Sequence, residues 1–236
     1  MGIEVWHAAA AVDQGGPLEA ACQRWLSREE QQHAERYRKA TTRNQFIVGR
    51  GMARRLLAER LNCEPQAIRF RHAEHGKPHL VDEAGIEFNV AHTGGLVAVA
   101  LGGSEPVGVD VECLSRRIDL GIAQRYFSAP EVDYLHRQPA AQQPEVFLRI
   151  WTLKESFIKA IGTGLTMPLD RFAFAALDSD RPQLSFVPDD SEQARLWGPA
   201  GRWHSQLLRP QADYLIAVTT RRADAPPINL QPFTVA

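Results

Sequence analysis

The sequence predicts an α+β protein made of two similarly built halves, residues 1–105 and 106–236. The first observation behind this prediction is an order of strand, helices and short strands that occurs before residue 107 and again after it. The second is length, because 236 residues can form either one core or two small ones. With 44% hydrophobic and 23% charged residues, the composition is typical of a globular protein and disfavours a disordered chain or a coiled coil.

In the first half, the hydrophobic pattern predicts one strand followed by helices. Ser27 and Glu30 have the spacing of a capping box, in which each side chain accepts a hydrogen bond from the backbone of the other at the start of a helix. Residues 36–61 combine an apolar face with a basic face, which predicts one long helix. The predicted elements are a strand at residues 3–11 and helices at 18–26, after Ser27, and at 36–61.

Three short extended segments follow, and glycine pairs separate them. The pairs Gly94-Gly95 and Gly102-Gly103 are typical of hairpin turns, so we expect the segments to form an antiparallel meander. The three strands are expected at residues 88–92, 96–101 and 107–111.

In the second half, Ser128 precedes Pro130 and Glu131 in the pattern of a helix start. A strong helical pattern over residues 145–161 ends at Gly162, because glycine readily adopts the left-handed conformation that terminates helices. The remaining predictions are a helical segment at 118–127 and strands within residues 172–187, 203–208 and 214–219.

Charge and cysteine content restrict the class of protein. The 27 Lys and Arg residues nearly balance 28 Asp and Glu residues, which is unlike a typical nucleic-acid-binding protein. The three cysteines include no CxxC pair, so they indicate neither a disulfide framework nor a thiolate metal site. The N-terminal segment lacks the basic region of a signal peptide, and the longest apolar run elsewhere is far below the roughly 20 residues that span a bilayer. We therefore expect a cytoplasmic protein with neither nucleic-acid nor membrane partners.

Two carboxylates on one predicted strand are the first candidate site. Because side chains alternate along a strand, Asp110 and Glu112 project from the same face. Two carboxylates at this spacing form half a site for a hard divalent cation such as Mg²⁺. An ordinary strand with two solvent-facing acids explains the same pattern.

Further candidates follow on the predicted helix and in two turns. Glu155 and Lys159 lie one turn apart on one line of the helix, which is also the arrangement of a helical ion pair worth a few tenths of a kcal/mol. His92 and Thr93 end the strand before a glycine turn, and Lys77 is followed by Pro78 in another turn, at Gly76-Lys77-Pro78. Each of these groups alone is compatible with ordinary polar surface.

Taken together, these segments resemble a known family. The sequences GKP, FNVAHTGG, VGVDVE, RYFSAPE and WTLKESFIKAIGTGL occur in the order found in the 4′-phosphopantetheinyl transferases, in particular the larger Sfp-type enzymes. The resemblance covers about residues 36–172. It implies that two pseudo-symmetric halves of the 4′-phosphopantetheinyl transferase fold enclose a cleft. The implied reaction transfers phosphopantetheine from coenzyme A to a serine of an acyl or peptidyl carrier protein and releases adenosine 3′,5′-bisphosphate.

The resemblance also implies roles for the candidate residues. Asp110, Glu112 and Glu155 would hold Mg²⁺ against the pyrophosphate of coenzyme A. Glu155 would also accept the proton of the serine hydroxyl, although Asp110 or a metal-bound water is an open alternative for this role. Lys159 resembles the lysine of the family that contacts phosphate.

The coenzyme A contacts implied by the resemblance are Lys77, Pro78, His92 and Lys159, and Thr93, Arg43 and Arg50 are expected to replace family contacts that this chain lacks. The two arginines are expected because this chain has Glu30 and His33 where relatives often carry two lysines. They lie in a basic segment, residues 24–60, with ten Lys and Arg against four Asp and Glu. We expect this basic surface, and the segment 116–125, to face the carrier protein.

Two other functions remain open at this point. The first is a non-catalytic module of the same fold that binds coenzyme A or a carrier protein. The second is a Mg²⁺-dependent nucleotide hydrolase, although the sequence has no Walker-type glycine loop. Because two halves of one chain can build the cleft, we expect a monomer.

Overall fold

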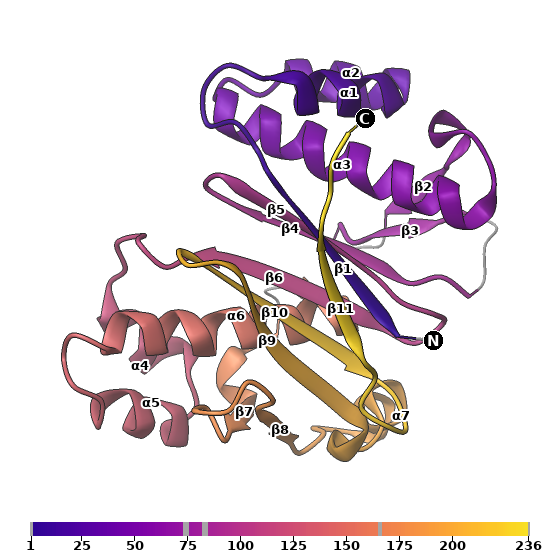
Figure 1. Ribbon diagram of the computed structural model, residues 1–236. Helices are drawn as coiled ribbons and strands as arrows, with labels where there is room; N and C mark the ends of the chain where they lie inside the picture. The colour runs from indigo at the N-terminus through magenta and orange to yellow at the C-terminus, as the bar shows by residue number, and fades with distance from the viewer. Residues whose placement is uncertain (1, 73–75, 82–84, 165–166, 236) are drawn as a thin grey trace.

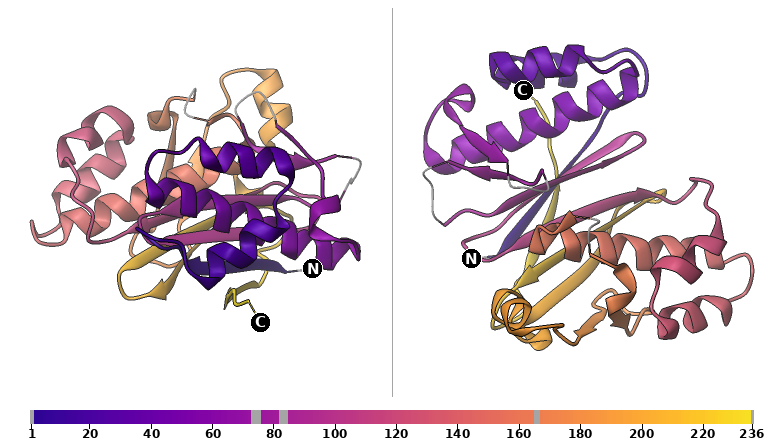
Figure 2. Two further views of the ribbon diagram at one scale, coloured as in Figure 1. Left: turned by 90° about the horizontal axis from the view of Figure 1, so that it is seen from above. Right: turned by 180° about the vertical axis from the view of Figure 1, so that it is seen from behind.

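The computed structural model describes residues 2–72, 76–81, 85–164 and 167–235, and it confirms the predicted α+β class. The chain forms four layers, in the order helices, sheet, sheet, helices (Figure 1). The view from behind shows the same order of layers (Figure 2).

The elements of the first half are β1 (Ile3–Ala9), α1 (Pro17–Trp25), α2 (Arg28–Glu35), α3 (Ala40–Leu61), β2 (Phe70–His72), β3 (Pro78–Leu80), β4 (Phe88–Thr93) and β5 (Leu96–Leu101). Those of the second half are β6 (Val107–Cys113), α4 (Ala123–Tyr126), α5 (Ala129–His136), α6 (Gln143–Ile161), β7 (Phe172–Ala175), β8 (Gln183–Phe186), α7 (Ser191–Trp197), β9 (Trp203–Gln211), β10 (Tyr214–Arg221) and β11 (Ile228–Pro232).

The local signals for helix ends are confirmed. Ser27 and Glu30 form the predicted capping box of α2, and Ser128 and Glu131 form one at α5. The long α6 ends at Gly162, which has the left-handed φ of 79°. α7, β2, β3 and β11 were not predicted, because each is short and has little periodic pattern.

The predicted three-stranded meander is wrong. β4 and β5 do form an antiparallel hairpin through Gly94-Gly95, but β6 belongs to a second sheet with the order β6-β10-β9. β5 already has β1 and β4 as neighbours, so it offers no edge to β6. β4 meets β6 through a side chain, since Oδ1 of Asn89 accepts a hydrogen bond from the amide of Val109 at 2.9 Å.

The described residues form three apolar cores, which hold the four layers together. One lies between α1, α3 and the first sheet, and includes Leu57 and Val99. A second lies between the two sheets and contains the valines of β6. The third lies between the second sheet and α6, and includes Phe157 and Leu207. Both sheets are therefore buried on both faces, and β6 lies close to the middle of the molecule.

The strand β11 returns from the second sheet to the first. It pairs in parallel with β1, so that Ile228 lies opposite Ile3, and the first sheet has the order β11-β1-β5-β4 (Figure 1). Phe233, just after the strand, packs edge-on against Trp6 and Trp25. Residues of the predicted second half thus complete the sheet of the first half.

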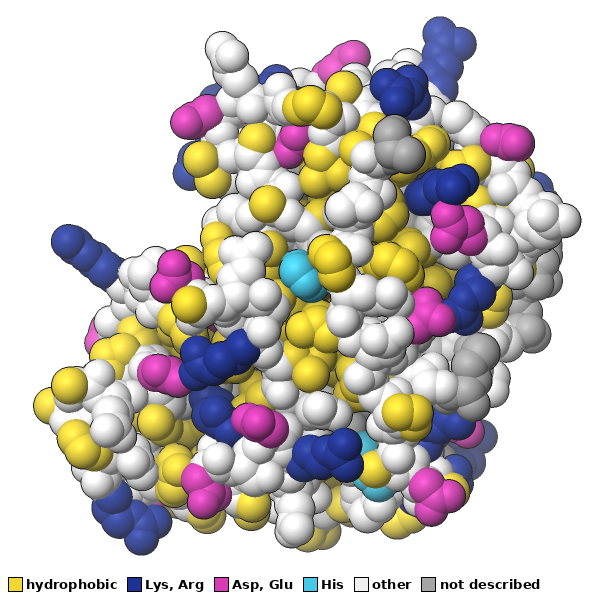
Figure 3. Space-filling view, in the orientation of Figure 1, with side chains coloured by type: hydrophobic (Ala, Val, Ile, Leu, Met, Phe, Trp, Pro, Cys, Tyr) yellow, Lys and Arg dark blue, Asp and Glu magenta, His cyan; other side chains and the backbone are white. Residues whose placement is uncertain are grey.

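Among the described residues, none of the helices combines the length and apolar character required to cross a bilayer. Basic and acidic side chains are interspersed over the face seen in Figure 3.

Candidate active site

The strand β6 and the helix α6 meet at Gly108, where no side chain separates their backbones. A Cβ atom built on Gly108 would lie 2.1 Å from the carbonyl oxygen of Ser156 and 2.3 Å from the amide nitrogen of Ala160. Only glycine fits such an approach, which is a common reason for a glycine within a strand. The contact brings the polar side chains of β6 against the middle of α6.

Asp110 and Glu112 lie on the same face of β6 as Gly108, because side chains alternate along the strand. The valines between them are buried in the core between the sheets. The two acidic residues are each only 6% exposed. The alternative of an ordinary solvent-facing strand is therefore wrong.

Lys159 joins this face from α6. Its Nζ lies 2.6 Å from Oδ1 of Asp110, so an ion pair links the helix to the strand. Burial lowers the pKa of Lys159, but the neighbouring carboxylates, Asp110 first, raise it by a larger amount. The ammonium group therefore stays charged at neutral pH.

Two carboxyl groups beside this ion pair have raised pKa values. Burial and the charge of Asp110 raise the pKa of Glu112 to about 7, and Arg116 and Lys159 oppose this rise. Burial also raises the pKa of Glu155, where Lys159 lowers it and Asp110 adds to the increase. Raised values of this kind are typical of acids and bases in active sites.

The donor set of this cluster fits a hard divalent cation. Oδ2 of Asp110 is buried, and no hydrogen-bond partner for it is present among the described residues. An unpaired buried carboxylate oxygen is costly, and carboxylate oxygens are the ligands that Mg²⁺ prefers. In the described ranges, however, no three His, Cys, Asp or Glu side chains already surround a metal position. Arg116 contacts Glu112 and Lys159 contacts Asp110, so a metal would displace part of these contacts.

A pocket of about 250 Å³ opens beside Lys159. Lys77 lines it from the turn before β3, Pro78 from the first position of β3, and Asn89 from β4. Glu155 and Lys159 line it from α6. Four of the predicted site residues, two from each half of the chain, therefore share one pocket.

The ammonium of Lys77 is engaged within the protein. Nζ lies 3.1 Å from the carbonyl oxygen of Val107 and 3.3 Å from that of Ala160. Burial lowers its pKa, and Glu87, whose carboxylate lies 3.5 Å away, opposes the decrease. Lys77 therefore braces the start of β6 against the end of α6, although it also lines the pocket.

His92 lies at the end of β4 and is influenced by the charges of the cluster. Burial and the charge of Lys159 lower its pKa, whereas Asp110 raises it. These influences come from the second half, although His92 belongs to the first. His92 is therefore within electrostatic range of Lys159 and Asp110, although the residue is exposed.

The turn after His92 is held by both halves of the chain. The side-chain nitrogen of Gln45, on α3, donates to the carbonyl oxygen of Thr93 at 2.5 Å. The hydroxyl of Tyr214, on β10, donates to the carbonyl oxygen of Gly94 at 2.9 Å. Thr93 therefore has a fixed backbone at the edge of the cluster.

The structure does not bring the two predicted arginines to this pocket. Arg43 is exposed and lines a different pocket, formed by α1, α2 and α3. Arg50 stacks on Phe70, with its guanidinium carbon 4.8 Å from the ring centre, and its Nε lies 3.3 Å from Glu30. The capping residue Glu30 also pairs with Arg54.

The basic surface predicted for residues 24–60 is neutralised in part, because four of its ten basic residues form ion pairs with glutamates. Besides the two arginines paired with Glu30, Arg55 pairs with Glu59, and Arg60 pairs with Glu4 from β1. Glu4 lies far from Arg60 in the chain, so no local pattern predicts this pairing.

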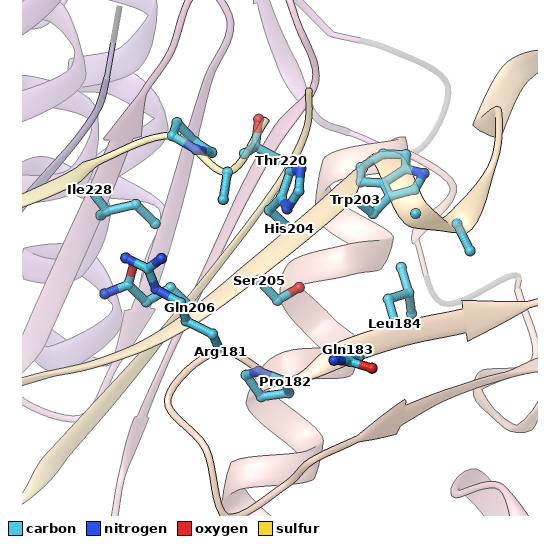
Figure 4. Close-up of a pocket in the computed structure, with 14 residues that line it drawn as sticks. Arg181, Pro182, Gln183, Leu184, Trp203, His204, Ser205, Gln206, Thr220 and Ile228 are labelled. Carbon is cyan, nitrogen blue, oxygen red and sulfur yellow. The ribbon is translucent and has the colours of Figure 1, made fainter. Parts of the chain in front are cut away.

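Another pocket, of about 320 Å³, lies along β9 and contains none of the predicted site residues. Its polar lining includes His204, Ser205 and Gln206 from β9 and Arg181 from the segment before β8 (Figure 4).

Sequence reasoning missed three residues that shape the site. Gly108 sets the distance between β6 and α6, and a glycine inside a predicted strand was the available signal. Lys154 is completely buried, and its Nζ contacts Glu131 at 2.8 Å, which ties α6 to α5. Arg116 contacts both carboxylate oxygens of Glu112.

Comparison with known proteins agrees with this arrangement. Residues 106–219 match the family model for the 4′-phosphopantetheinyl transferase superfamily, and residues 18–104 match that for the N-terminal part of a 4′-phosphopantetheinyl transferase. The 4′-phosphopantetheinyl transferase HetI of Nostoc sp. is 33% identical over 167 residues, which are 69% of this chain and 70% of HetI.

The 4′-phosphopantetheinyl transferase Sfp of Bacillus subtilis is 33% identical over 149 residues, which are 63% of this chain and 66% of Sfp. Among solved structures, the holo-[acyl-carrier-protein] synthase of Thermotoga maritima covers 50% of this chain with a TM-score of 0.39 and 22% identity. From the two family models and the similarity to HetI, the chain belongs to the 4′-phosphopantetheinyl transferase superfamily.

Proposed function

We propose that this protein transfers the 4′-phosphopantetheine group of coenzyme A to a serine hydroxyl of an acyl or peptidyl carrier protein, with release of adenosine 3′,5′-bisphosphate. The observation that carries the proposal is the junction of β6 and α6. There Asp110, Glu112, Glu155 and Lys159 converge beside a pocket lined by both halves of the chain. Membership of the family supplies the reaction class.

We propose Mg²⁺ as the metal, held by Asp110, Glu112 and Glu155. The buried, unpaired Oδ2 of Asp110 supports this assignment. When bound, the ion would neutralise negative charge on the pyrophosphate of coenzyme A.

Glu155 is the proposed general base. A serine hydroxyl is a weak nucleophile and needs a proton acceptor within hydrogen-bond reach. The pKa of Glu155 is raised, mainly by burial, and a higher pKa makes its carboxylate a stronger base near neutral pH. Glu155 lines the pocket, and its carboxylate would receive the serine proton while the serine oxygen bonds to phosphorus and the bond from that phosphorus to the oxygen of the departing adenosine 3′,5′-bisphosphate breaks.

Lys159 is the proposed cation for the transferring phosphate. Its raised pKa keeps the ammonium charged, so it can donate hydrogen bonds to a phosphate oxygen on which negative charge develops. Its present bond to Asp110 holds it at the rim of the pocket.

We propose that Pro78, His92 and Thr93 contact the nucleotide end of coenzyme A. Pro78 lines the pocket, and the pKa of His92 shows the influence of Lys159 and Asp110. Contacts of Arg43 and Arg50 with coenzyme A have less support. Arg43 lines a different pocket, and Arg50 pairs with Glu30. Because both halves of one chain line the pocket, we propose that the protein acts as a monomer, and we propose the cytoplasm as its location.

The test is to incubate the protein with coenzyme A, Mg²⁺ and a panel of apo carrier proteins, and to weigh the carriers by mass spectrometry. We expect one phosphopantetheine group to be added to at least one acyl or peptidyl carrier. Glu155→Gln should abolish the addition, whereas Glu145→Gln, an exposed position on the same helix, should not. Binding of coenzyme A without any gain of carrier mass would show that the protein is a binding module and not a transferase.

A further inference from the structure

Arg116 contacts the carboxylate of Glu112 in an unusual way. A single nitrogen, Nη1, lies 2.8 Å from one carboxylate oxygen and 2.9 Å from the other. An arginine more often offers two nitrogens to the two oxygens of a carboxylate. Here one positively charged nitrogen contacts both oxygens, so a cation held by this carboxylate would compete with the guanidinium for the same two atoms.

The two partners differ in their freedom to move. Glu112 lies on β6, opposite Leu215 of β10, and its side chain is 8% exposed. Arg116 lies after the strand, in a turn closed by the bond from its own amide to the carbonyl of Cys113, and its side chain is 42% exposed. Arg116 can therefore leave the contact by side-chain rotation alone, whereas Glu112 stays in the sheet.

The charged form of Glu112 needs a counter-cation at this position. Glu112 and Asp110 are buried next to each other, and the charge of Asp110 acts unfavourably on a charged Glu112. Removal of one partner from a buried ion pair leaves an uncompensated charge, which is costly. A divalent cation bound by both carboxylates would compensate their charge in place of Arg116. The guanidinium and the metal are therefore alternative partners of Glu112.

We propose that Arg116 is an exchangeable counter-cation, which holds Glu112 in the metal-free protein and is displaced when a divalent cation binds. This inference rests on the metal site of the proposed function. It assigns Arg116 a role in metal selectivity as well as in positioning. The guanidinium carries one positive charge. A monovalent ion that displaced it would leave the charge of the cluster unchanged, whereas a divalent ion would make the cluster more positive by one charge.

The test measures metal affinity without coenzyme A or a carrier protein. Binding of MgCl₂ is followed by calorimetry, and Mn²⁺ is followed by electron paramagnetic resonance, in the wild type, Arg116→Gln, Arg116→Lys and Arg117→Gln. The control Arg117→Gln removes the same charge from the neighbouring exposed position. We expect Arg116→Gln to bind Mg²⁺ about three- to tenfold more tightly than Arg117→Gln, as expected for loss of a charged hydrogen-bonded competitor. Arg116→Lys should remain close to the wild type.

A second measurement tests selectivity. NaCl should weaken Mg²⁺ binding to Arg116→Gln more than tetramethylammonium chloride does at the same ionic strength, and the two salts should act equally on the wild type. Equal Mg²⁺ affinity of Arg116→Gln and Arg117→Gln would overturn the inference and leave the transferase proposal intact if carriers still gain mass. Absence of Mg²⁺ binding by every variant would overturn both this inference and the proposed metal site.

Discussion

The most direct test of the site geometry is Gly108→Ala. The added Cβ would lie 2.1 Å from the carbonyl oxygen of Ser156, whereas real Cβ atoms essentially never approach closer than 3.0 Å. Relief of this clash requires β6 and α6 to separate by about 0.9 Å, because the atoms in the way belong to the backbone and cannot rotate aside. Overpacking of this kind costs about 1–3 kcal/mol of unfolding free energy, and we expect the upper end of that range.

The same displacement acts on the chemistry. Asp110 is two residues from Gly108, and its oxygen lies 2.6 Å from Lys159 on the helix that must move. A misplacement of about 1 Å costs about a hundredfold in rate when reacting groups depend on precise positions. We therefore expect a loss of about this size in single-turnover transfer to a carrier protein.

Urea unfolding followed by circular dichroism measures the stability, and carrier mass against time measures the transfer. Gly201→Ala is the matched control, because a Cβ built there meets no atom within 4 Å. The reasoning is refuted if Gly108→Ala has the urea midpoint of Gly201→Ala and transfers within twofold of the wild type.

Three further predictions concern buried polar groups. Lys154→Met should lower the unfolding free energy by about 3–5 kcal/mol in urea, because the buried charge of Glu131 loses its cationic partner and keeps only the hydrogen bonds from Ser128 and Phe174. Glu131→Gln in the same chain removes this charge and should restore part of the loss. Asn89→Ala should cost about 1–3 kcal/mol in the same assay, because the amide of Val109 loses its acceptor, whereas Asn89→Asp keeps one. The pKa of Glu112 is about 7 in the folded protein, against 4.5 for an ordinary glutamate, so the folded state binds this proton more tightly than the unfolded state. As the pH rises from 4.5 to 7, the unfolded state loses the proton first, and the metal-free protein should lose about 3 kcal/mol of unfolding free energy. Thermal melts of Glu112→Gln should lack this decrease.

Predictions that rest on local patterns agree with the structure. The capping box at Ser27 and the alternation of Asp110 with Val109 depend on neighbours in the chain, so the sequence contains all the information they require. The convergence of Glu155 with Asp110 could be predicted only through the family resemblance, because no local pattern relates a strand to a distant helix.

Predictions that depended on distant partners were less successful. The sheet membership of β6 is decided by pairing with β10, about a hundred residues later, and a glycine pair before β6 gave the opposite indication. Likewise, Arg50 has the pattern of a phosphate-binding residue on a basic helix face, and only the packing of α2 on α3 places Glu30 against it. Which strand pairs with β6, and which acid pairs with Arg50, depends on the tertiary structure. The periodicity of hydrophobic residues in the sequence contains no information about such choices.

The return of β11 to the first sheet has a consequence for biosynthesis. During translation, β1 emerges early, but the parallel neighbour that covers its edge begins at Ile228 and is made only after the whole second sheet. Until then, β1 presents unpaired backbone groups, which are a template for pairing with other chains. A pairing over such a sequence separation also forms slowly, since a long loop must close first. The nascent first half is therefore the stage at which this protein most needs protection from aggregation, and the first sheet is completed only after β11 has been made.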